Sequence, residues 1–158
     1  MNLLSINMCG IREKVKRRRV ANLCSEHGVS FLAIQESRVT SVDLFELTSL
    51  WGSFTFDFAV SSSRRLSGGL ISLWDQAASN KIKITCLENA IIVHGEWMFS
   101  KFRCFMVNVY APQPDVQKRR LWGQLLDFME VNPGDYVLCG DFNAVREMTD
   151  RWGSDFPH

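Results

Sequence analysis

The sequence predicts an α/β (α+β) protein built as a four-layer sandwich, in which two packed β-sheets, mixed or antiparallel, are flanked by helices. Three observations predict this class. Two strand–helix units open the chain, a run of strands at hairpin spacing fills its middle, and a helix followed by a strand comes last. Because 158 residues suffice for one domain with a sizeable core, we expect residues 1–158 to form a single domain.

The first half of the chain is expected to hold the two strand–helix units. A short apolar strand covers residues 2–7, after which apolar residues recur at helical spacing until a stop signal at Gly28. Residues 29–36 form a continuous apolar run, which is typical of a strand buried on both faces. Ser41 is expected to cap a short helix that ends at Trp51.

The middle of the chain is expected to be all strand, because short apolar runs follow one another at hairpin-like spacing. A helix then returns, since Leu121, Trp122 and Leu125 repeat at the helical period, and the segment 132–134 (NPG) ends it. The expected strands cover residues 53–60, 69–75, 81–88, 90–98, 101–110 and 135–141.

Composition excludes several classes of protein. A hydrophobic content of 46% and a charged content of 22% are ordinary for a soluble globular chain. The five cysteines form no CxxC pair and the three histidines are scattered, so no zinc spacing exists. We find no signal-peptide pattern and no stretch of transmembrane length. These features predict a reduced, intracellular, soluble domain without a membrane partner.

Polar residues collect where the predicted strands end. Asn7, Glu36, Tyr110 and Asp141 each stand at or next to such an end. Taken singly, each has an ordinary structural explanation, such as a turn asparagine or a solvated glutamate. Strand ends and their loops converge at one rim of an α/β framework, so the combination predicts a functional site there.

The residue types suit the hydrolysis of a phosphate ester, which needs charge neutralisation, an oriented water and a stabilised leaving group. Glu36 is suited to Mg²⁺, which takes only one or two protein ligands. In extended backbone Asp141 and Asn143 project to the same side. Asp141 could then accept a proton from the attacking water while Asn143 donates to a phosphate oxygen. The hydroxyl of Tyr110 could bond the same phosphate.

Four motifs then carry a resemblance. LLSINMCGI, LAIQES, VNVYAPQ and LCGDFNAV occur in the order found in the endonuclease/exonuclease/phosphatase superfamily. LFELTSLWG, SGGLISLW, KRRLWGQLLDFM and GDFNAVRE resemble the endonuclease domain of plant LINE-type (non-LTR) retrotransposons. The resemblance implies a DNA endonuclease dependent on Mg²⁺, with Mn²⁺ as a substitute, and a nuclear location for a functional protein. It gives Asp141, Asn143 and Tyr110 catalytic roles, and it makes Asn7 a holder of the metal or of an adjacent carboxylate.

The family pattern continues past His158 with further strands and a Ser-Asp-His segment that completes the site. His27 and His94 match no family position and are not evident replacements. The resemblance therefore implies a C-terminally truncated domain that lacks its closing strands. We expect such a fragment to be inactive or impaired, and to self-associate through an exposed sheet edge.

Two basic stretches invite a role in nucleic-acid binding. The run REKVKRRR (12–19) could contact phosphates or act as a nuclear localisation signal, against the ordinary expectation of a solvated helix face. Arg64 and Arg65, in the expected loop 61–69, are candidate substrate-binding residues facing DNA.

Two alternatives to the endonuclease stay open: a non-catalytic transposon-derived binding or interaction module, which the missing segment favours, and a phosphomonoesterase of the same superfamily. The KRRLW segment favours DNA over the latter.

Overall fold

The computed structural model describes residues 1–62, 68–98 and 101–144. In chain order its elements are β1 (Leu3–Asn7), α1 (Lys14–Glu26), β2 (Phe31–Gln35), α2 (Leu44–Trp51), β3 (Phe56–Ser61), β4 (Leu70–Asp75), β5 (Ser79–Cys86), β6 (Ala90–Trp97), β7 (Phe102–Tyr110), α3 (Asp115–Val131) and β8 (Asp135–Asp141). Every strand and helix that the sequence predicts is present in this order.

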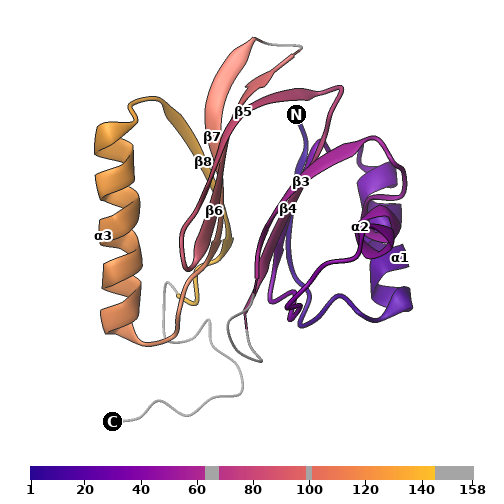
Figure 1. The fold of residues 1–158 in the computed structure, drawn as a ribbon, viewed down its shortest axis with the longest axis horizontal. Helices are drawn as coiled ribbons and strands as arrows, with labels where there is room; N and C mark the ends of the chain where they lie inside the picture. The colour runs from indigo at the N-terminus through magenta and orange to yellow at the C-terminus, as the bar shows by residue number, and fades with distance from the viewer. Residues whose placement is uncertain (63–67, 99–100, 145–158) are drawn as a thin grey trace.

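The strands form two four-stranded sheets, with the orders β1-β2-β4-β3 and β5-β6-β7-β8. The pairs β1–β2 and β7–β8 are parallel and the other neighbours are antiparallel, so both sheets are mixed. The sheets face each other, α1 and α2 cover the outer face of the first sheet, and α3 covers the outer face of the second (Figure 1). The predicted four-layer sandwich is confirmed.

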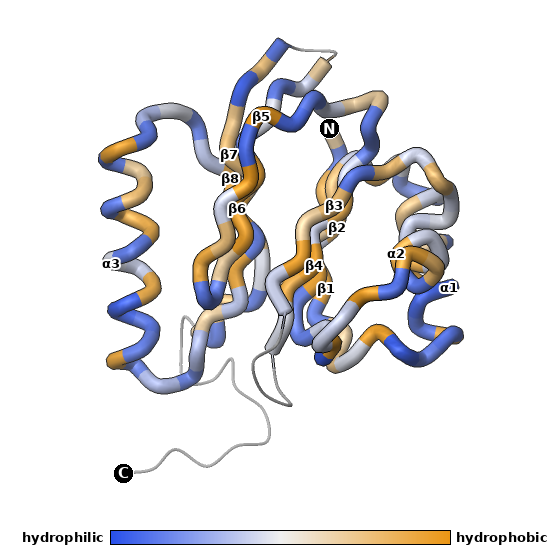
Figure 2. Tube along the Cα trace, in the orientation of Figure 1, coloured by the Kyte–Doolittle hydropathy of each residue, from blue (hydrophilic) through white to orange (hydrophobic). Residues whose placement is uncertain are grey.

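Apolar side chains fill the three spaces between these layers. The residues buried between the two sheets include Phe31, Trp74 and Met106, and further clusters lie under the helices on each side. The hydropathy of the chain follows this arrangement, with apolar residues concentrated in the strands and apolar and polar residues alternating along the helices (Figure 2). All five residues of β2 are buried, as its continuous apolar run predicts.

The start of α2 differs from the prediction. Ser41 does not cap this helix; instead the carboxylate of Asp43 accepts a hydrogen bond from the backbone N–H of Phe45 at 3.1 Å. The carbonyl of Asp43 also accepts the N–H groups of Glu46 and Leu47. Serine and aspartate cap helices about equally well. The choice of Asp43 over Ser41 therefore depends on where the chain turns into the helix, which the residue types alone do not indicate.

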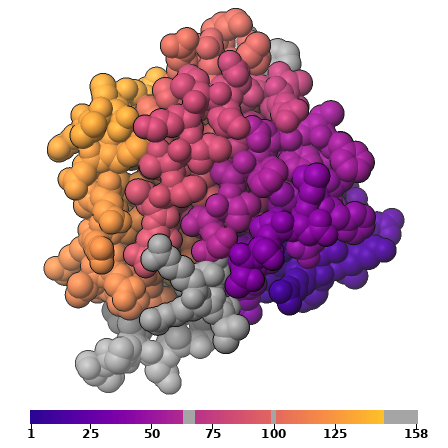
Figure 3. Space-filling model, in the orientation of Figure 1, coloured from indigo at the N-terminus to yellow at the C-terminus, as the bar shows by residue number. Residues whose placement is uncertain are grey.

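The topology brings four strand ends to one end of the molecule. Two parallel pairs, β1–β2 and β7–β8, point their carboxyl ends the same way, toward the lower edge of the view in Figure 1. In the space-filling view, the amino-terminal half of the chain and the α3–β8 half lie on opposite sides of the molecule, with the middle strands between them (Figure 3). A site at this end is therefore assembled from both halves.

None of the helices within the described ranges is long and apolar enough to cross a membrane.

Candidate active site

Four of the predicted site residues meet at this end of the two sheets, and hydrogen bonds join them. Nδ2 of Asn7 donates to Oε1 of Glu36 at 3.2 Å and to Oδ2 of Asp141 at 2.9 Å. The hydroxyl of Tyr110 donates to the same Oε1 of Glu36 at 2.7 Å. Asp141, Asn7, Glu36 and Tyr110 thus form one bonded chain of side chains, supplied by the ends of β8, β1, β2 and β7.

Glu36 is the centre of this cluster. Its side chain is 15% exposed, and its second oxygen, Oε2, accepts a charged hydrogen bond from Arg38 at 3.1 Å. Burial raises the pKa of this carboxyl, but the hydrogen bonds from Tyr110, Asn7 and Arg38 outweigh it and leave the pKa below the ordinary value of 4.5. Glu36 is therefore a carboxylate at neutral pH, ready to attract a cation.

The phenol of Tyr110 stays protonated at neutral pH. Its pKa is raised, first by burial and then by its hydrogen bond to Glu36 and the negative charge of Glu36 and Asp141. A neutral phenol can donate its proton to an oxygen anion. The residue therefore offers a hydrogen-bond donor at the site throughout the neutral range.

Asp141 is held from both sides. Besides the bond from Asn7, its Oδ1 accepts the backbone N–H of Asn143 at 2.9 Å. The preceding Gly140 lies directly against β7: a Cβ built on it would be 1.9 Å from the carbonyl oxygen of Val109. The φ of +140° at this position is also one that residues with a side chain rarely adopt. Glycine at 140 therefore allows β8 to bring Asp141 beside Tyr110, its partner in the ladder register.

Asn143 does not have the geometry that the sequence predicts. We expected extended backbone that would project Asp141 and Asn143 to the same side. Instead β8 ends at Asp141, and Asn143 has a left-handed φ of 45°. An Asx-type turn, in which the Asp141 side chain accepts the N–H two residues later, replaces the extended chain. Nδ2 of Asn143 then donates to the carbonyl of Ala111 at 2.7 Å, which ties this loop to the end of β7.

Backbone strain is concentrated at this end of the molecule. Outside glycine, left-handed φ values are uncommon because the Cβ crowds the backbone. Five such residues occur among the described ones, and four of them are at the site; only Lys101 lies elsewhere. The four, with their φ values, are Cys9 (48°), Glu36 (51°), Arg38 (54°) and Asn143 (45°). Such clusters are characteristic of functional sites, where surrounding contacts hold the strained conformation.

Two residues at the site were not anticipated from the sequence. Arg38 reaches back across a tight turn to Glu36, and the Sγ of Cys9 lies 3.5 Å from Oδ1 of Asn7. Partial loss of solvent around the Sγ, and then the hydrogen bond and negative charge of Glu36, raise the pKa of the Cys9 thiol. Arg38 stands two residues after a candidate metal ligand, which is the only sequence signal that could have identified it.

The donor atoms at the site fit a hard divalent cation. Glu36 and Asp141 supply carboxylate oxygens, and Mg²⁺ prefers one or two carboxylates with the remaining positions filled by water. Asn7 directs its Nδ2 toward both carboxylates, while its Oδ1 accepts the backbone N–H of Cys9 at 3.2 Å. In this arrangement Asn7 orients the two carboxylates. Within the described ranges, no group of three or more His, Cys, Asp or Glu side chains could hold a metal by itself.

Other predicted residues lie away from the site or outside the described part of the chain. Arg64 and Arg65 lie outside the described residues. His27 ends α1, where its carbonyl accepts Nδ2 of Asn2. The ring of His94 stacks on Phe105 in the second sheet, with centroids 4.2 Å apart. Neither histidine is a member of the bonded cluster.

The basic run 12–19 divides between structural and exposed residues. Arg17 is buried, and its NH1 donates to the carbonyls of Ile11 and Arg12 at 2.8 and 2.7 Å. Arg12, Lys14, Arg18 and Arg19 are exposed. The expectation of a uniformly solvated face is therefore wrong for Arg17, because its guanidinium satisfies carbonyls in the segment that enters α1.

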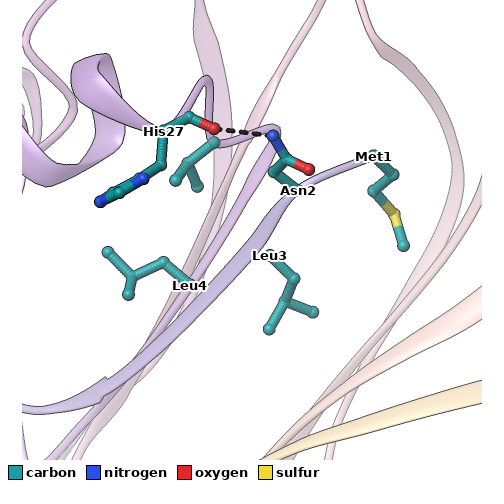
Figure 4. A pocket seen from close by; sticks show the side chains of 6 residues that line it. Met1, Asn2, Leu3, Leu4 and His27 are labelled. Atoms are coloured by element: carbon teal, nitrogen blue, oxygen red, sulfur yellow. Dashed lines mark hydrogen bonds between the residues drawn. The ribbon is translucent and has the colours of Figure 1, made fainter.

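Two hollows of the surface lie at the other end of the molecule. A pocket of about 470 Å³ is lined by Met1, Leu3, Leu4 and their neighbours around the start of β1, and the Asn2 side chain turns toward the carbonyl of His27 there (Figure 4). A second hollow, of about 550 Å³, lies beside Asp57 and Lys81. Neither hollow is lined by a residue of the bonded cluster.

The two mixed four-stranded sheets, with helices on both outer faces (Figure 1), define a two-sheet α/β sandwich. The chain belongs to the Endonuclease/Exonuclease/phosphatase family, whose model matches residues 4–155.

Solved structures show the same fold. An AP endonuclease from Archaeoglobus fulgidus matches with a TM-score of 0.70 and 16% identity, over 95% of this chain and 60% of that one. TDP2 from C. elegans matches with a TM-score of 0.67 and 16% identity, over 98% of this chain and 50% of that one. The AP endonuclease LMAP from Leishmania major matches with a TM-score of 0.65 and 14% identity, over 97% and 58%. The chain thus spans between half and three fifths of the length of these structures.

Proposed function

We propose that this chain is a DNA endonuclease domain of the LINE retrotransposon type, which hydrolyses phosphodiesters with the help of Mg²⁺ or Mn²⁺. The observation that supports this most strongly is the bonded chain from Asp141 through Asn7 and Glu36 to Tyr110. It joins a cation-attracting carboxylate, a second carboxylate and a neutral donor at one rim. The LINE-like motifs quoted above support the finer assignment, which also implies a nuclear location.

Each residue has a role that its contacts allow. Glu36 would hold the metal ion, which when bound would neutralise negative charge on a phosphoryl oxygen. Tyr110 would turn its hydroxyl from Glu36 to a phosphoryl oxygen. Each oxygen of Asp141 accepts one hydrogen bond from the protein and keeps a lone pair, so Asp141 would accept a proton from the attacking water. Asn143 has one amide hydrogen left for a phosphate after its bond to Ala111.

Surface charge supports DNA as the substrate. The start of α1 follows the end of β1, and the start of α3 follows the end of β7, so both helices begin at the end of the molecule that holds the site. Exposed basic side chains lie near both starts. Arg12 and Lys14 flank the exposed Glu13 at the first, and Arg119 and Arg120 lie one turn beyond the exposed Asp115 at the second. Such side chains provide affinity for phosphates that does not depend on base sequence.

We also propose that residues 1–158 alone nick DNA weakly or not at all. The resemblance gives the complete family site a further histidine and aspartate beyond Asn143, and neither His27 nor His94 joins the cluster. Removal of one donor that stabilises the transition state typically lowers the rate by roughly 10²–10³. Metal binding should survive, because Glu36 and its partners are all present.

The test combines metal binding with cleavage. Mn²⁺ binding is followed by electron paramagnetic resonance and nicking of supercoiled plasmid by gel, for wild type, Glu36→Gln and Asp141→Asn. Glu96→Gln is the matched control, because it removes a carboxylate paired with Arg103 on the surface of the second sheet. We expect Glu36→Gln to weaken Mn²⁺ binding at least tenfold while Glu96→Gln leaves it unchanged. Any nicking should require both Glu36 and Asp141.

A non-catalytic binding module is the second candidate. The observation that favours it is the Arg38–Glu36 ion pair, which neutralises the central carboxylate without a metal. Mn²⁺ binding that is equal in wild type and Glu36→Gln would support this candidate and contradict the endonuclease. Turnover of p-nitrophenyl phosphate without nicking would instead favour the phosphomonoesterase.

A further inference from the structure

A buried pair of amides joins the two sheets directly behind the site. Nε2 of Gln35 donates to Oδ1 of Asn108 at 2.7 Å, and the two residues are 1% and 0% exposed. Gln35 belongs to β2 in the first sheet and Asn108 to β7 in the second. The space between the sheets is otherwise filled mostly by apolar side chains. A polar bond in this position holds two particular atoms together, which apolar packing alone does not do.

Asn108 is fixed by further contacts on its other side. Its Nδ2 donates to the carbonyls of Ile34 and Ile71 at 3.3 and 3.0 Å, and to Oγ of Ser72 at 3.2 Å. Ile34 and Ile71 are the last pair in register between β2 and β4. The carboxamide of Asn108 therefore lies against the place where the ladder of the opposite sheet ends. All its polar atoms are satisfied, so its position has little freedom.

The site residues follow this pair along the same two strands. Glu36 is the next residue after Gln35, and Tyr110 lies two residues after Asn108, on the same face of β7. The 2.7 Å bond between Tyr110 and Glu36 is thus the neighbour of the buried Gln35–Asn108 bond. Both bonds cross the same gap between β2 and β7, one inside the protein and one at the rim.

We propose that Gln35 and Asn108 are positioning residues, which set the spacing of β2 and β7 so that the Tyr110 hydroxyl meets Glu36. This rests on the proposed function only in taking Glu36 and Tyr110 as the site. Loss of the amide pair should displace Tyr110 from Glu36 in a protein that still folds. A merely structural role would lower stability and leave this contact unchanged.

The chain offers a direct spectroscopic readout, because it has two tyrosines, Tyr110 and Tyr136. Tyrosine labelled with ¹³C at the ring Cζ gives one NMR signal for each, and Tyr136→Phe assigns them. In Gln35→Met, which loses the donor to Asn108, we expect the Tyr110 signal to shift upfield while the Tyr136 signal stays. Ser72→Ala is the matched control, since it removes a different contact of Asn108 and leaves the bond from Gln35.

The possible results separate the two roles. A Tyr110 signal that moves in Gln35→Met but not in Ser72→Ala supports the proposal, and so does the same shift in Asn108→Ser, which removes the bond from the other strand. An unmoved Tyr110 signal in a folded Gln35→Met overturns it. If neither Gln35→Met nor Asn108→Ser melts cooperatively, the proposal is also overturned, because the amide pair would then be needed for the protein to fold.

A catalytic readout is available where the wild type cleaves DNA. Loss of a group that orients a metal ligand typically costs 10- to 100-fold in metal affinity or activity. We therefore expect Gln35→Met to lower kcat by about 10-fold or more, with KM for plasmid nearly unchanged. If the wild type neither binds Mn²⁺ nor nicks DNA, the proposed function fails, while the NMR experiment still decides the role of the amide pair.

Discussion

Gly140 packs so closely on Val109 that a Cβ at residue 140 would lie 1.9 Å from the Val109 carbonyl oxygen. The two residues are register partners in the parallel β7–β8 pair, one position before Tyr110 and Asp141. The glycine in the GDFN motif is thus required by the neighbouring strand. Because Gly140 has no side chain, β8 can lie close to β7 and bring Asp141 beside Tyr110.

We predict that Gly140→Ala destabilises the protein by about 3 kcal/mol or more, because it adds both a steric clash and an unfavourable φ. Urea unfolding measures the change. Gly123→Ala in α3 is the matched control: its Cβ would meet nothing within 4 Å, and alanine in a helix is favoured over glycine by about 0.5–1 kcal/mol. Equal stabilities for the two variants would contradict the close approach of β7 and β8.

Tyr110→Phe should lower stability at neutral pH and make it less sensitive to acid. The hydroxyl helps to keep the pKa of Glu36 below 4.5. A lowered folded-state pKa contributes stability above the unfolded pKa, and this contribution is lost as the pH falls through the folded-state pKa. Without the hydroxyl the pKa of Glu36 rises toward its ordinary value, so less stability remains to be lost.

The measurement is urea unfolding of wild type and Tyr110→Phe at neutral pH and below pH 4.5. A hydrogen bond to a charged group is worth about 1.5–3 kcal/mol. Because the bond between Tyr110 and Glu36 is partly exposed, we expect the free energies of unfolding of the two proteins to differ by an amount near the lower end of this range at neutral pH. The difference in free energy of unfolding between wild type and Tyr110→Phe should be smaller at the acid pH. A gap that widens on acidification would mean that Tyr110 does not stabilise the ionised form of Glu36. Tyr136→Phe controls for loss of a hydroxyl elsewhere.

The basic run 12–19 should respond unequally to substitution. Arg17→Ala removes hydrogen bonds to two backbone carbonyls and to Oγ of Ser49 from a buried position. We expect a loss of about 1.5–3 kcal/mol in thermal or urea unfolding. Arg18→Ala, next to it and exposed, should change stability by less than about 0.5 kcal/mol. If Arg18→Ala proved the more harmful, the structural assignment of Arg17 would be wrong.

The cysteines should fall into two groups in thiol titration of the native protein. Cys9 and Cys86 are exposed, whereas Cys24, Cys104 and Cys139 are buried. Burial raises the pKa of Cys139 to about 12 and that of Cys24 to about 11, which leaves almost no thiolate to react. Two equivalents of a disulfide reagent should react before unfolding and five after it. Mass mapping that found Cys139 modified in the native protein would contradict this.

The outer edge of β8 should promote self-association of residues 1–158. Among the described strands, β8 pairs only with β7, and Leu138 on it is 38% exposed. Unpaired edges of this kind bind other strands. Light scattering after gel filtration should show dimers or larger species that Leu138→Lys reduces. Val116→Lys, at an exposed position on α3 and on neither sheet edge, is the control. Monodisperse monomer for the unmodified chain would refute the prediction.

The order of elements could be predicted because its signals are local. Each strand and helix is marked by signals within its own segment: apolar runs, the spacing of apolar residues, and turn residues at the ends. These signals can be recognised without knowing which other element the segment packs against. The convergence of Asn7, Glu36, Tyr110 and Asp141 also followed from their positions at strand ends, since parallel pairs bring such ends together. What these residues do chemically is a proposal that the mutants above test.

Features that depend on contacts between distant segments could not be predicted in the same way. Asn143 follows a strand, and GDFN is compatible with either extended backbone or an Asx turn. Its side chain also bonds the carbonyl of Ala111, a contact between segments distant in the sequence. Arg38 and Glu36 form an ion pair across a tight turn in which both have left-handed backbone, a conformation that their sequence does not indicate. Asn108 was visible only as one polar residue in an apolar strand, and its partners come from β2 and β4.

The bond between Asn7 and Asp141 joins residues 134 positions apart, and so it has a consequence for synthesis of the chain. Asn7 and Glu36 leave the ribosome early, but the carboxylate that completes the bonded cluster arrives only with the last described strand. A nascent chain that has folded only its first sheet therefore cannot form the cluster. The polypeptide therefore completes this bonded cluster late, after nearly all of its described elements have been made.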